Sequence, residues 1–240
     1  MNRNTIAMMA LVGLSFLGGF LLSSHPYFTS SRAMHLAQMV NGEYLNHWFN
    51  TRVAQYPNDL IQYQQIISEV QPDWIIETGT LEGGLTLFLS NVLQGIHPEG
   101  KIITVDIDPV GWNKTSEEAA QSPGKKKLLE RIEFIQGSST AAEVIQKIKT
   151  RIPEGSKVLV LLDSLHSKDH VMEEMKLYGP LVSKGSYLIV SDTHLDHFFG
   201  APGPMEAVRA FLKTNSDFTQ DRSRERYLIS ANFSGWLKKK

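Results

Sequence analysis

Carboxylate and imidazole side chains gather in one stretch of this 240-residue sequence, between positions 163 and 197. Its members are Asp163, His166, Asp169, His170, Asp192, His194, Asp196 and His197. Asp163 and Asp192 each follow an apolar run, and two neighbouring strands would bring their carboxylates to one point. Two unpaired carboxylates repel, and a hard divalent cation such as Mg²⁺ relieves the repulsion because it prefers oxygen ligands. His166 follows Asp163 closely enough to act as a base beside such a cation.

A simpler interpretation of the same stretch stays open. Aspartate commonly caps a following helix, so Asp163 and Asp192 could serve that purpose while the histidines are solvated. His170 begins the next expected helix, where an exposed residue of the first turn is more common than a metal ligand.

A glycine-containing loop follows the first apolar run and reads Glu77-Thr78-Gly79-Thr80-Leu81-Glu82-Gly83-Gly84. A G-x-G-x-x-G dinucleotide loop needs its second glycine so that the backbone can approach a pyrophosphate. Leu81 occupies that position, which argues against NAD and FAD. Glu77 would repel a diphosphate, whereas S-adenosylmethionine (SAM) carries no phosphate and needs no such approach.

Asp106 ends the second apolar run, where an acid accepts hydrogen bonds from both ribose hydroxyls of a bound nucleoside. Its alternative is a helix cap or a turn residue, and the same holds for Glu77. Together with the loop, Asp106 favours a SAM site. The residues predicted to bind the cofactor are Glu77, Gly79, Thr80, Gly83, Asp106, Ser138 and Asp163.

Short apolar runs alternating with amphipathic segments indicate an α/β fold in which helices cover both faces of a parallel sheet. The runs are 74–76, 102–105, 132–135, 158–162 and 187–190, and the expected helices are 84–93, 140–149, 168–178 and 204–213. Helical periodicity also marks 35–70. Two late runs, 218–222 and 226–231, look like an antiparallel hairpin at the sheet edge. The pattern predicts a single doubly wound domain.

Composition narrows the function classes further. Lys and Arg total 24 against 25 Asp and Glu, for a net charge of −1, which argues against nucleic-acid binding. Hydrophobic residues make up 42%, typical of a globular protein rather than a disordered one. There is no cysteine, so a disulfide framework, a thiolate zinc site and a cysteine nucleophile are excluded.

The N-terminal region differs in composition from the rest of the chain, because no charged residue lies between Arg3 and Arg32. An uncharged stretch from Asn4 to Ser24 is long enough to span a bilayer core of about 30 Å. We expect residues 1–24 to form a single-pass membrane anchor helix, with a signal peptide as the alternative. Residues 25–33 are a tether and 34–240 the folded domain, expected in the cytosol, where SAM is made.

Beyond these features, the sequence resembles the cephalosporin hydroxylase / rhamnosyl O-methyltransferase family over roughly residues 45 to 237. The resemblance rests on segments at 56–67, 72–84, 162–166, 178–187, 192–193, 203–208 and 221–227. It implies a Rossmann-like class I methyltransferase domain with a mostly parallel seven-stranded sheet. It also implies Mg²⁺ beside the methyl donor, with Asp163 and Asp192 as ligands and His166 as the base.

One position departs from the family pattern, because Ser191 stands where a glutamate commonly provides a further metal ligand. Water, His194 or substrate oxygens are the alternatives for that ligand. The resemblance implies a SAM-dependent O-methyltransferase acting on a sugar hydroxyl of a glycolipid, polysaccharide or glycosylated metabolite. The alternative is an accessory protein that binds the cofactor without turnover. No nucleic-acid partner is expected, and a homo-oligomer stays open.

Overall fold

A seven-stranded, mostly parallel sheet organises the computed structural model, which describes residues 46–196, 202–227 and 229–240. Its strands are β3 (Trp74–Thr78), β4 (Lys101–Asp106), β5 (Ile132–Gln136), β6 (Val158–Leu162), β7 (Tyr187–Val190), β8 (Phe218–Gln220) and β9 (Trp236–Lys239). They lie in the order β5-β4-β3-β6-β7-β9-β8, and β9 pairs antiparallel with both of its neighbours. The predicted α/β class and mostly parallel sheet are confirmed.

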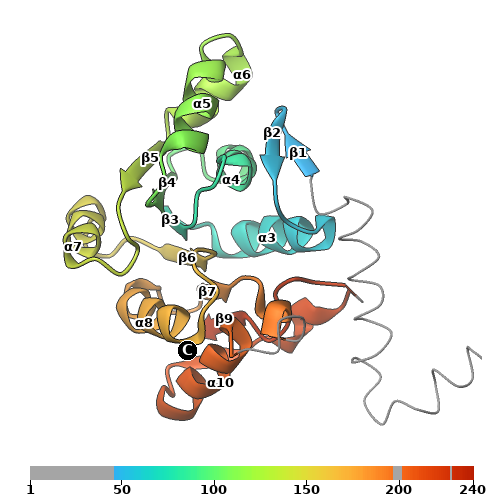
Figure 1. The fold of residues 1–240 in the computed structure, drawn as a ribbon, viewed down its shortest axis with the longest axis vertical. Helices are drawn as coiled ribbons and strands as arrows, with labels where there is room; N and C mark the ends of the chain where they lie inside the picture. The colour runs from blue at the N-terminus through green and yellow to red at the C-terminus, as the bar shows by residue number, and fades with distance from the viewer. Residues whose placement is uncertain (1–45, 197–201, 228) are drawn as a thin grey trace, which may run out of the picture. The chain divides into compact units, whose positions relative to one another are not determined.

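Helices cover both faces of this sheet, as Figure 1 shows for α3 and α4 on one side and α7 and α8 on the other. The helices are α3 (Pro57–Val70), α4 (Gly84–Ile96), α5 (Val110–Ala119), α6 (Pro123–Leu129), α7 (Ala142–Arg151), α8 (Lys168–Tyr178) and α10 (Pro204–Thr214). Short 3-10 turns occupy η1 (Gly179–Leu181), η2 (Thr193–Leu195) and η3 (Arg222–Glu225).

Two apolar cores result from the alternation of side chains along the central strands. Ile75 and Leu159 face the core formed with α3 and α4, whereas Ile76 and Val160 face the core formed with α7, α8 and α10. A strand buried on both faces must be apolar at every position, which explains the uninterrupted run Val158–Leu162.

The chain changes direction between β3 and β6. It proceeds outward from β3 to β4 and β5, and then crosses back to place β6 on the other side of β3. In open α/β sheets, ligands bind outside the carboxyl ends of the strands at such a point. The residues that follow β3, β4, β5, β6 and β7 therefore converge on one site.

The helix expected over 35–70 is shorter than predicted. Within the described part of that range, helix α3 begins at Pro57, and an antiparallel hairpin of β1 (Asn46–Trp48) and β2 (Thr51–Val53) precedes it. Phe49 and Asn50 form the hairpin turn with φ of 50° and 59°. A two-residue turn with both φ values positive matches the twist of paired strands. Strands of only three residues are too short to show a clear alternation of apolar and polar residues, so the sequence did not reveal them.

The second half of the predicted late hairpin is wrong. The described residues of 226–231 form no strand, and the partner of β8 is β9 at Trp236–Lys239. Ser230 and Ala231 instead hydrogen-bond to the buried carboxylate of Asp59. The expectation of C-terminal antiparallel strands is confirmed, but the tertiary contact of this segment with α3 is invisible to local periodicity.

The expected membrane anchor at 1–24 and the tether at 25–33 lie outside the described residues. Among the helices that are described, none combines the length and the apolar character that crossing a bilayer requires.

Candidate functional site

A cavity of about 620 Å³ opens at the carboxyl ends of the central strands. Of the residues predicted from the sequence, six line it: Gly79, Asp106, Ser138, Asp163, His166 and Asp192. Leu81, Ile107 and Leu165 add exposed apolar side chains to its wall. The cavity therefore joins the predicted cofactor residues to the predicted metal residues in one space.

The loop after β3 is shaped by glycine. Gly79 has φ of 85°, and a Cβ atom there would lie 2.0 Å from the carbonyl oxygen of Asp163. Gly83 has φ of 80°, and its Cβ would meet the ring of Trp112 at 2.7 Å. Both positions exclude other residues for two reasons, the left-handed backbone and the lack of space.

Asp106 ties this loop to the end of β4. Its Oδ2 accepts a hydrogen bond from the backbone N–H of Leu81 at 2.9 Å, and its Oδ1 accepts one from Asp108 at 3.0 Å. Each carboxylate oxygen can accept more than one hydrogen bond, so Asp106 orders the loop and keeps acceptor capacity toward the cavity. This location agrees with the ribose-binding role predicted for it.

Three of the predicted cofactor residues do not line the cavity. Glu77 is fully buried behind the loop, where its Oε2 accepts from Thr86 at 2.5 Å and Thr104 at 2.6 Å. The buried Thr80 contacts Thr104 in turn at 2.6 Å, and Gly83 packs on Trp112. Burial raises the pKa of Glu77 to about 7. The contacts of Glu77 and Thr80 tie the loop to Thr104 of β4 on its buried side, and Gly83 lets the loop pass close to Trp112.

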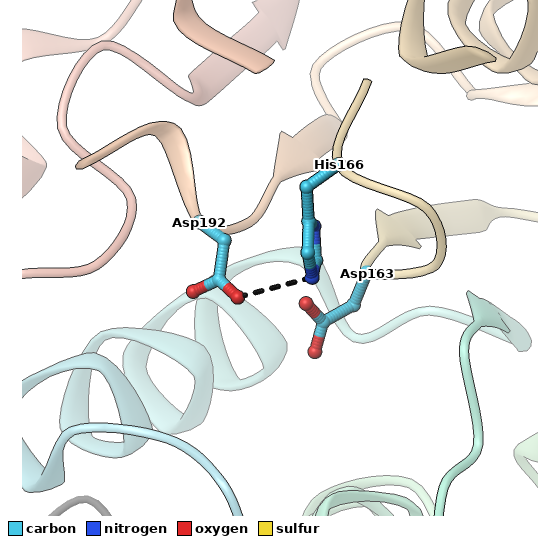
Figure 2. A group of neighbouring side chains, drawn as sticks. All are labelled: Asp163, His166 and Asp192. Carbon is cyan, nitrogen blue, oxygen red and sulfur yellow. Dashed lines mark ion pairs between the residues drawn. The ribbon is translucent and has the colours of Figure 1, made fainter. Parts of the chain in front are cut away.

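The side chains of Asp163, His166 and Asp192 gather at one point of the cavity lining, and Figure 2 shows them pointing toward one another. Asp163 follows β6, Asp192 follows β7, and His166 lies in the loop after Asp163. The Nε2 atom of His166 is 3.3 Å from Oδ2 of Asp192. One donor atom from each of the three side chains lies within 4.8 Å of the others.

The electrostatics of this cluster favour a cation. Burial and the nearby Asp192 carboxylate raise the pKa of Asp163 well above its ordinary value. A divalent cation would offset both costs. Octahedral coordination at about 2.1 Å spaces ligand atoms about 3 to 4.2 Å apart, so carboxylate oxygens of Asp163 and Asp192, which lie within 4.8 Å of each other, could bind one Mg²⁺ or Mn²⁺ after a small side-chain adjustment. The residues fit a hard metal ion.

The backbone at Asp192 is unusual. Its φ is 56°, a left-handed conformation that aspartate tolerates better than most residues. The neighbouring Ser191 is buried, and its hydroxyl lies 3.4 Å from the hydroxyl of Tyr63. Ser191 is therefore engaged with α3, and it is not part of the three-residue donor cluster.

The other histidines take different places. His194 is buried, and its Nδ1 atom lies 3.0 Å from the carbonyl oxygen of Ala231, so it belongs to the fold beneath the site. His170 is partly buried in the cavity wall rather than exposed, with Nε2 3.1 Å from the hydroxyls of Ser139 and Ser164. Nearby Glu174 raises the pKa of His170. His197 lies outside the described residues.

Helix capping, which the sequence left open for Asp163 and Asp192, is instead the role of Asp196. Its carboxylate accepts hydrogen bonds from the backbone N–H groups of Gly203, Met205 and Glu206 at 3.0 to 3.1 Å, at the start of α10. Asp169 is exposed in the first turn of α8. Neither carboxylate joins Asp163 and Asp192.

Sequence reasoning missed Gln55. This buried side chain donates from Nε2 to Oδ2 of Asp163 at 2.9 Å. It lies between β2 and α3, 108 positions before Asp163, and no local motif marks it.

Comparison with known proteins gives a family for this chain. The family model described as rhamnosyl O-methyltransferase/CmcI matches residues 41–240. Rhamnosyl O-methyltransferases of Mycobacterium tuberculosis and Mycobacterium leprae are 36% identical to this chain over 188 residues. The aligned part is 75% of this chain, and 69% and 76% of those two relatives.

Solved structures resemble the fold. A CmcI structure named for Mg and SAM has a TM-score of 0.60 at 18% identity, covering 81% of this chain and 76% of its own. An O-methyltransferase from Bacillus cereus in complex with SAH has a TM-score of 0.53 at 15% identity, covering 86% and 87%. At these identities the likeness establishes a methyltransferase fold.

Proposed function

Because the chain belongs to the rhamnosyl O-methyltransferase/CmcI family, we propose that it transfers a methyl group from SAM to a sugar hydroxyl. The observation that carries this proposal is the shared cavity. Asp106, on one side, suits a ribose, and Asp163, His166 and Asp192 gather donor atoms on the other side. A methyl donor and a cation-assisted hydroxyl would then meet in one space.

The reaction is an in-line displacement at carbon. The acceptor oxygen forms a bond to the methyl carbon as the sulfur–carbon bond breaks, and S-adenosylhomocysteine (SAH) leaves. Most of the acceleration must come from holding the two reactants in line. Asp106 and the loop at Gly79 hold the donor side, and the residues after β6 and β7 hold the acceptor side.

Asp163 and Asp192 are the residues that would hold Mg²⁺, since carboxylate oxygens suit it better than imidazole. When bound, the cation acts as a Lewis acid that lowers the pKa of a hydroxyl group.

His166 is then the base. Its imidazole is partly exposed to the cavity, and it takes the hydroxyl proton at a ring nitrogen as the new bond forms. Asp192, at 3.3 Å, stabilises the imidazolium that results.

The proposed acceptor is a sugar hydroxyl of a glycolipid, a polysaccharide or a glycosylated metabolite, and a rhamnoside is the first choice because the curated relatives are named for rhamnose. The test is transfer of labelled methyl from SAM to a panel of glycosides, with rhamnosides included. We expect transfer with Mg²⁺, loss after EDTA treatment, and recovery when Mg²⁺ is restored. Transfer unaffected by EDTA would contradict the metal assignment and leave methyl transfer standing.

The same experiment addresses the accessory-protein alternative. A protein that binds SAM or SAH in calorimetry but methylates none of the glycosides would favour it. A protein that binds neither adenosyl ligand would contradict the whole proposal.

We also retain the proposal that residues 1–24 anchor the chain in a membrane with the catalytic domain in the cytosol. Its support is the uncharged, largely apolar sequence between Arg3 and Arg32. Membrane fractionation of the full chain, compared with a fragment beginning at residue 34, tests it. Equal release of both into the soluble fraction would contradict the anchor.

A further inference from the structure

We propose that Gln55, Tyr63 and Asn232 are positioning residues that set Asp163 and Asp192 at the spacing a divalent cation needs. The inference rests on the proposed metal-assisted function and adds residues that touch neither the cation nor the substrate. The three side chains form one buried hydrogen-bond chain between the two carboxylates.

The chain of contacts is continuous. Gln55 donates from Nε2 to Oδ2 of Asp163 at 2.9 Å, and its Oε1 accepts from the hydroxyl of Tyr63 at 3.0 Å. Asn232 donates from Nδ2 to the hydroxyl oxygen of Tyr63 at 2.7 Å. Its Oδ1 accepts from the backbone N–H of Asp192 at 3.2 Å. The two candidate ligands are thus joined through three side chains from distant parts of the sequence.

Every contact in this chain has a fixed direction. A backbone N–H can only donate, so Asn232 must turn its oxygen to Asp192 and its NH₂ group to Tyr63. Tyr63 then receives one hydrogen bond on its oxygen and gives its proton to Gln55 at 3.0 Å, which is closer than the Ser191 hydroxyl at 3.4 Å. Gln55 must therefore present its own NH₂ group to Asp163. Reversing any one amide would set donor against donor or acceptor against acceptor.

Burial makes the arrangement hard to replace. Gln55, Tyr63 and Asn232 are only 2%, 1% and 0% exposed. Water therefore cannot readily substitute for a missing partner, and a buried polar group left unpaired is costly.

The consequence at the site is a defined pair of carboxylates. Gln55 occupies Oδ2 of Asp163, which fixes how that carboxylate is turned. Asn232 accepts a hydrogen bond from the backbone N–H of Asp192, a residue whose backbone is left-handed, and so helps to set where that carboxylate begins. Hydrogen-bond partners of metal ligands commonly orient them in this way, and losing one weakens metal binding about 10- to 100-fold.

The test measures the affinity for Mn²⁺, detected by electron paramagnetic resonance in the absence of any substrate. Tyr63→Phe removes only the hydroxyl and keeps the ring that packs on Trp236. The matched control is Tyr187→Phe, another buried tyrosine, whose hydroxyl bonds to Asp221 and Arg224 outside the site. We expect Tyr63→Phe to weaken Mn²⁺ binding about 10-fold or more. Tyr187→Phe should bind Mn²⁺ as the wild type does, and SAH affinity without metal should be unchanged in both.

A second variant covers the case in which Tyr63→Phe does not fold. Gln55→Met keeps the side-chain length but removes the donor to Asp163, and it should weaken Mn²⁺ binding to a similar extent. Because Tyr63 acts on Asp163 through Gln55, the double variant should lose less affinity than the product of the two single losses. A general loss of stability would give independent effects instead.

The outcomes separate the inference from the proposed function. A folded Tyr63→Phe or Gln55→Met protein with wild-type Mn²⁺ affinity overturns the inference while the metal site stands. A wild-type protein that binds no Mn²⁺ overturns both this inference and the metal part of the proposed function.

Discussion

The two halves of the cavity are built differently. In the half after β3 and β4, Asp106 binds backbone N–H groups at Leu81 and Asp108, which lie 25 and 2 positions away. In the half after β6 and β7, Gln55 bonds to Asp163 across 108 positions, and Asn232 bonds to Tyr63 and Asp192 across 169 and 40 positions. In the first half, hydrogen bonds to backbone N–H groups hold the carboxylate of Asp106 in place. In the second half, side chains from distant parts of the sequence hold the two carboxylates in place.

Exposure follows the same division. Leu81 and Ile107, in the half proposed to bind SAM (the cofactor half, after β3 and β4), are 48% and 70% exposed. In the half proposed to bind the cation (the metal half, after β6 and β7), Leu165 is also 60% exposed, but Asp192 is only 6% exposed. An open, apolar wall suits a ligand that arrives from solution and covers it. A buried polar surface suits a cation and a proton transfer that must be held in place. Substitutions in the cofactor half should therefore change SAM affinity, whereas substitutions in the metal half should change the rate of methyl transfer.

The largest effect belongs to the metal half. His166→Ala should lower kcat about 10²- to 10⁴-fold, the usual contribution of a general base, with little change in SAH affinity. Rates and melting temperatures should be measured on the same preparations. His97→Ala is the matched control, because His97 pairs with Asp73 at the opposite end of β3. A folded His166→Ala enzyme with near-normal turnover would remove this residue from the mechanism.

The next effect belongs to the cofactor half. Asp106→Ala should weaken SAM binding by about 1.5–3 kcal/mol, the cost of removing a charged hydrogen-bond acceptor. Calorimetry measures this directly. Asp108→Ala is the control, since Asp108 does not line the cavity. Equal affinities for the two variants would contradict the ribose-binding assignment.

A third effect concerns the pH dependence of protein stability, and it comes from the buried carboxyl group of Glu77. The pKa of Glu77 is about 7 in the folded protein, against an ordinary value of 4.5, so ionisation of Glu77 opposes folding. Its stabilising neutral form is present at low pH and is lost as pH rises through about 7. Denaturant unfolding of wild type and Glu77→Gln at pH 5 and pH 8 should reveal it.

The substitution should become more favourable by about 2 kcal/mol between pH 5 and pH 8. Asp59, whose pKa burial also raises to about 7, is present in both proteins and cancels from the difference. A difference that does not vary with pH would contradict the raised pKa, because it would mean that Glu77 binds the same number of protons in the folded and unfolded states.

The smallest effect concerns the exposed apolar side chains of the cavity wall and tests whether they contact bound SAM. Ile107→Ala should weaken SAM binding by about 1 kcal/mol, because a bound ligand would cover only part of this side chain. The melting temperature should stay the same, since Ile107 is 70% exposed without ligand. Val110, equally exposed but outside the cavity wall, supplies the control Val110→Ala. A loss shared by both variants would show that the wall does not contact the ligand.

The sequence predicted that Asp106, Asp163, His166 and Asp192 lie near one another, because these residues follow apolar runs and parallel strands bring such positions to one edge of the sheet. It predicted Glu77, Thr80 and Gly83 as cofactor residues, although these three do not line the cavity, because a strand pattern does not reveal which side of a turn is open. Gln55 and Asn232 could not be found, since their partners lie far away in the sequence.

The central claim is that the methyl donor and a divalent cation share one cavity, and one measurement tests it without knowledge of the acceptor. The protein would be loaded with Mn²⁺ and with SAM labelled with ¹³C at the methyl carbon, and electron–nuclear double resonance would be recorded. We predict a resolved ¹³C coupling that disappears in Asp163→Asn. Bound Mn²⁺ and bound SAM with no coupling between them would contradict the account.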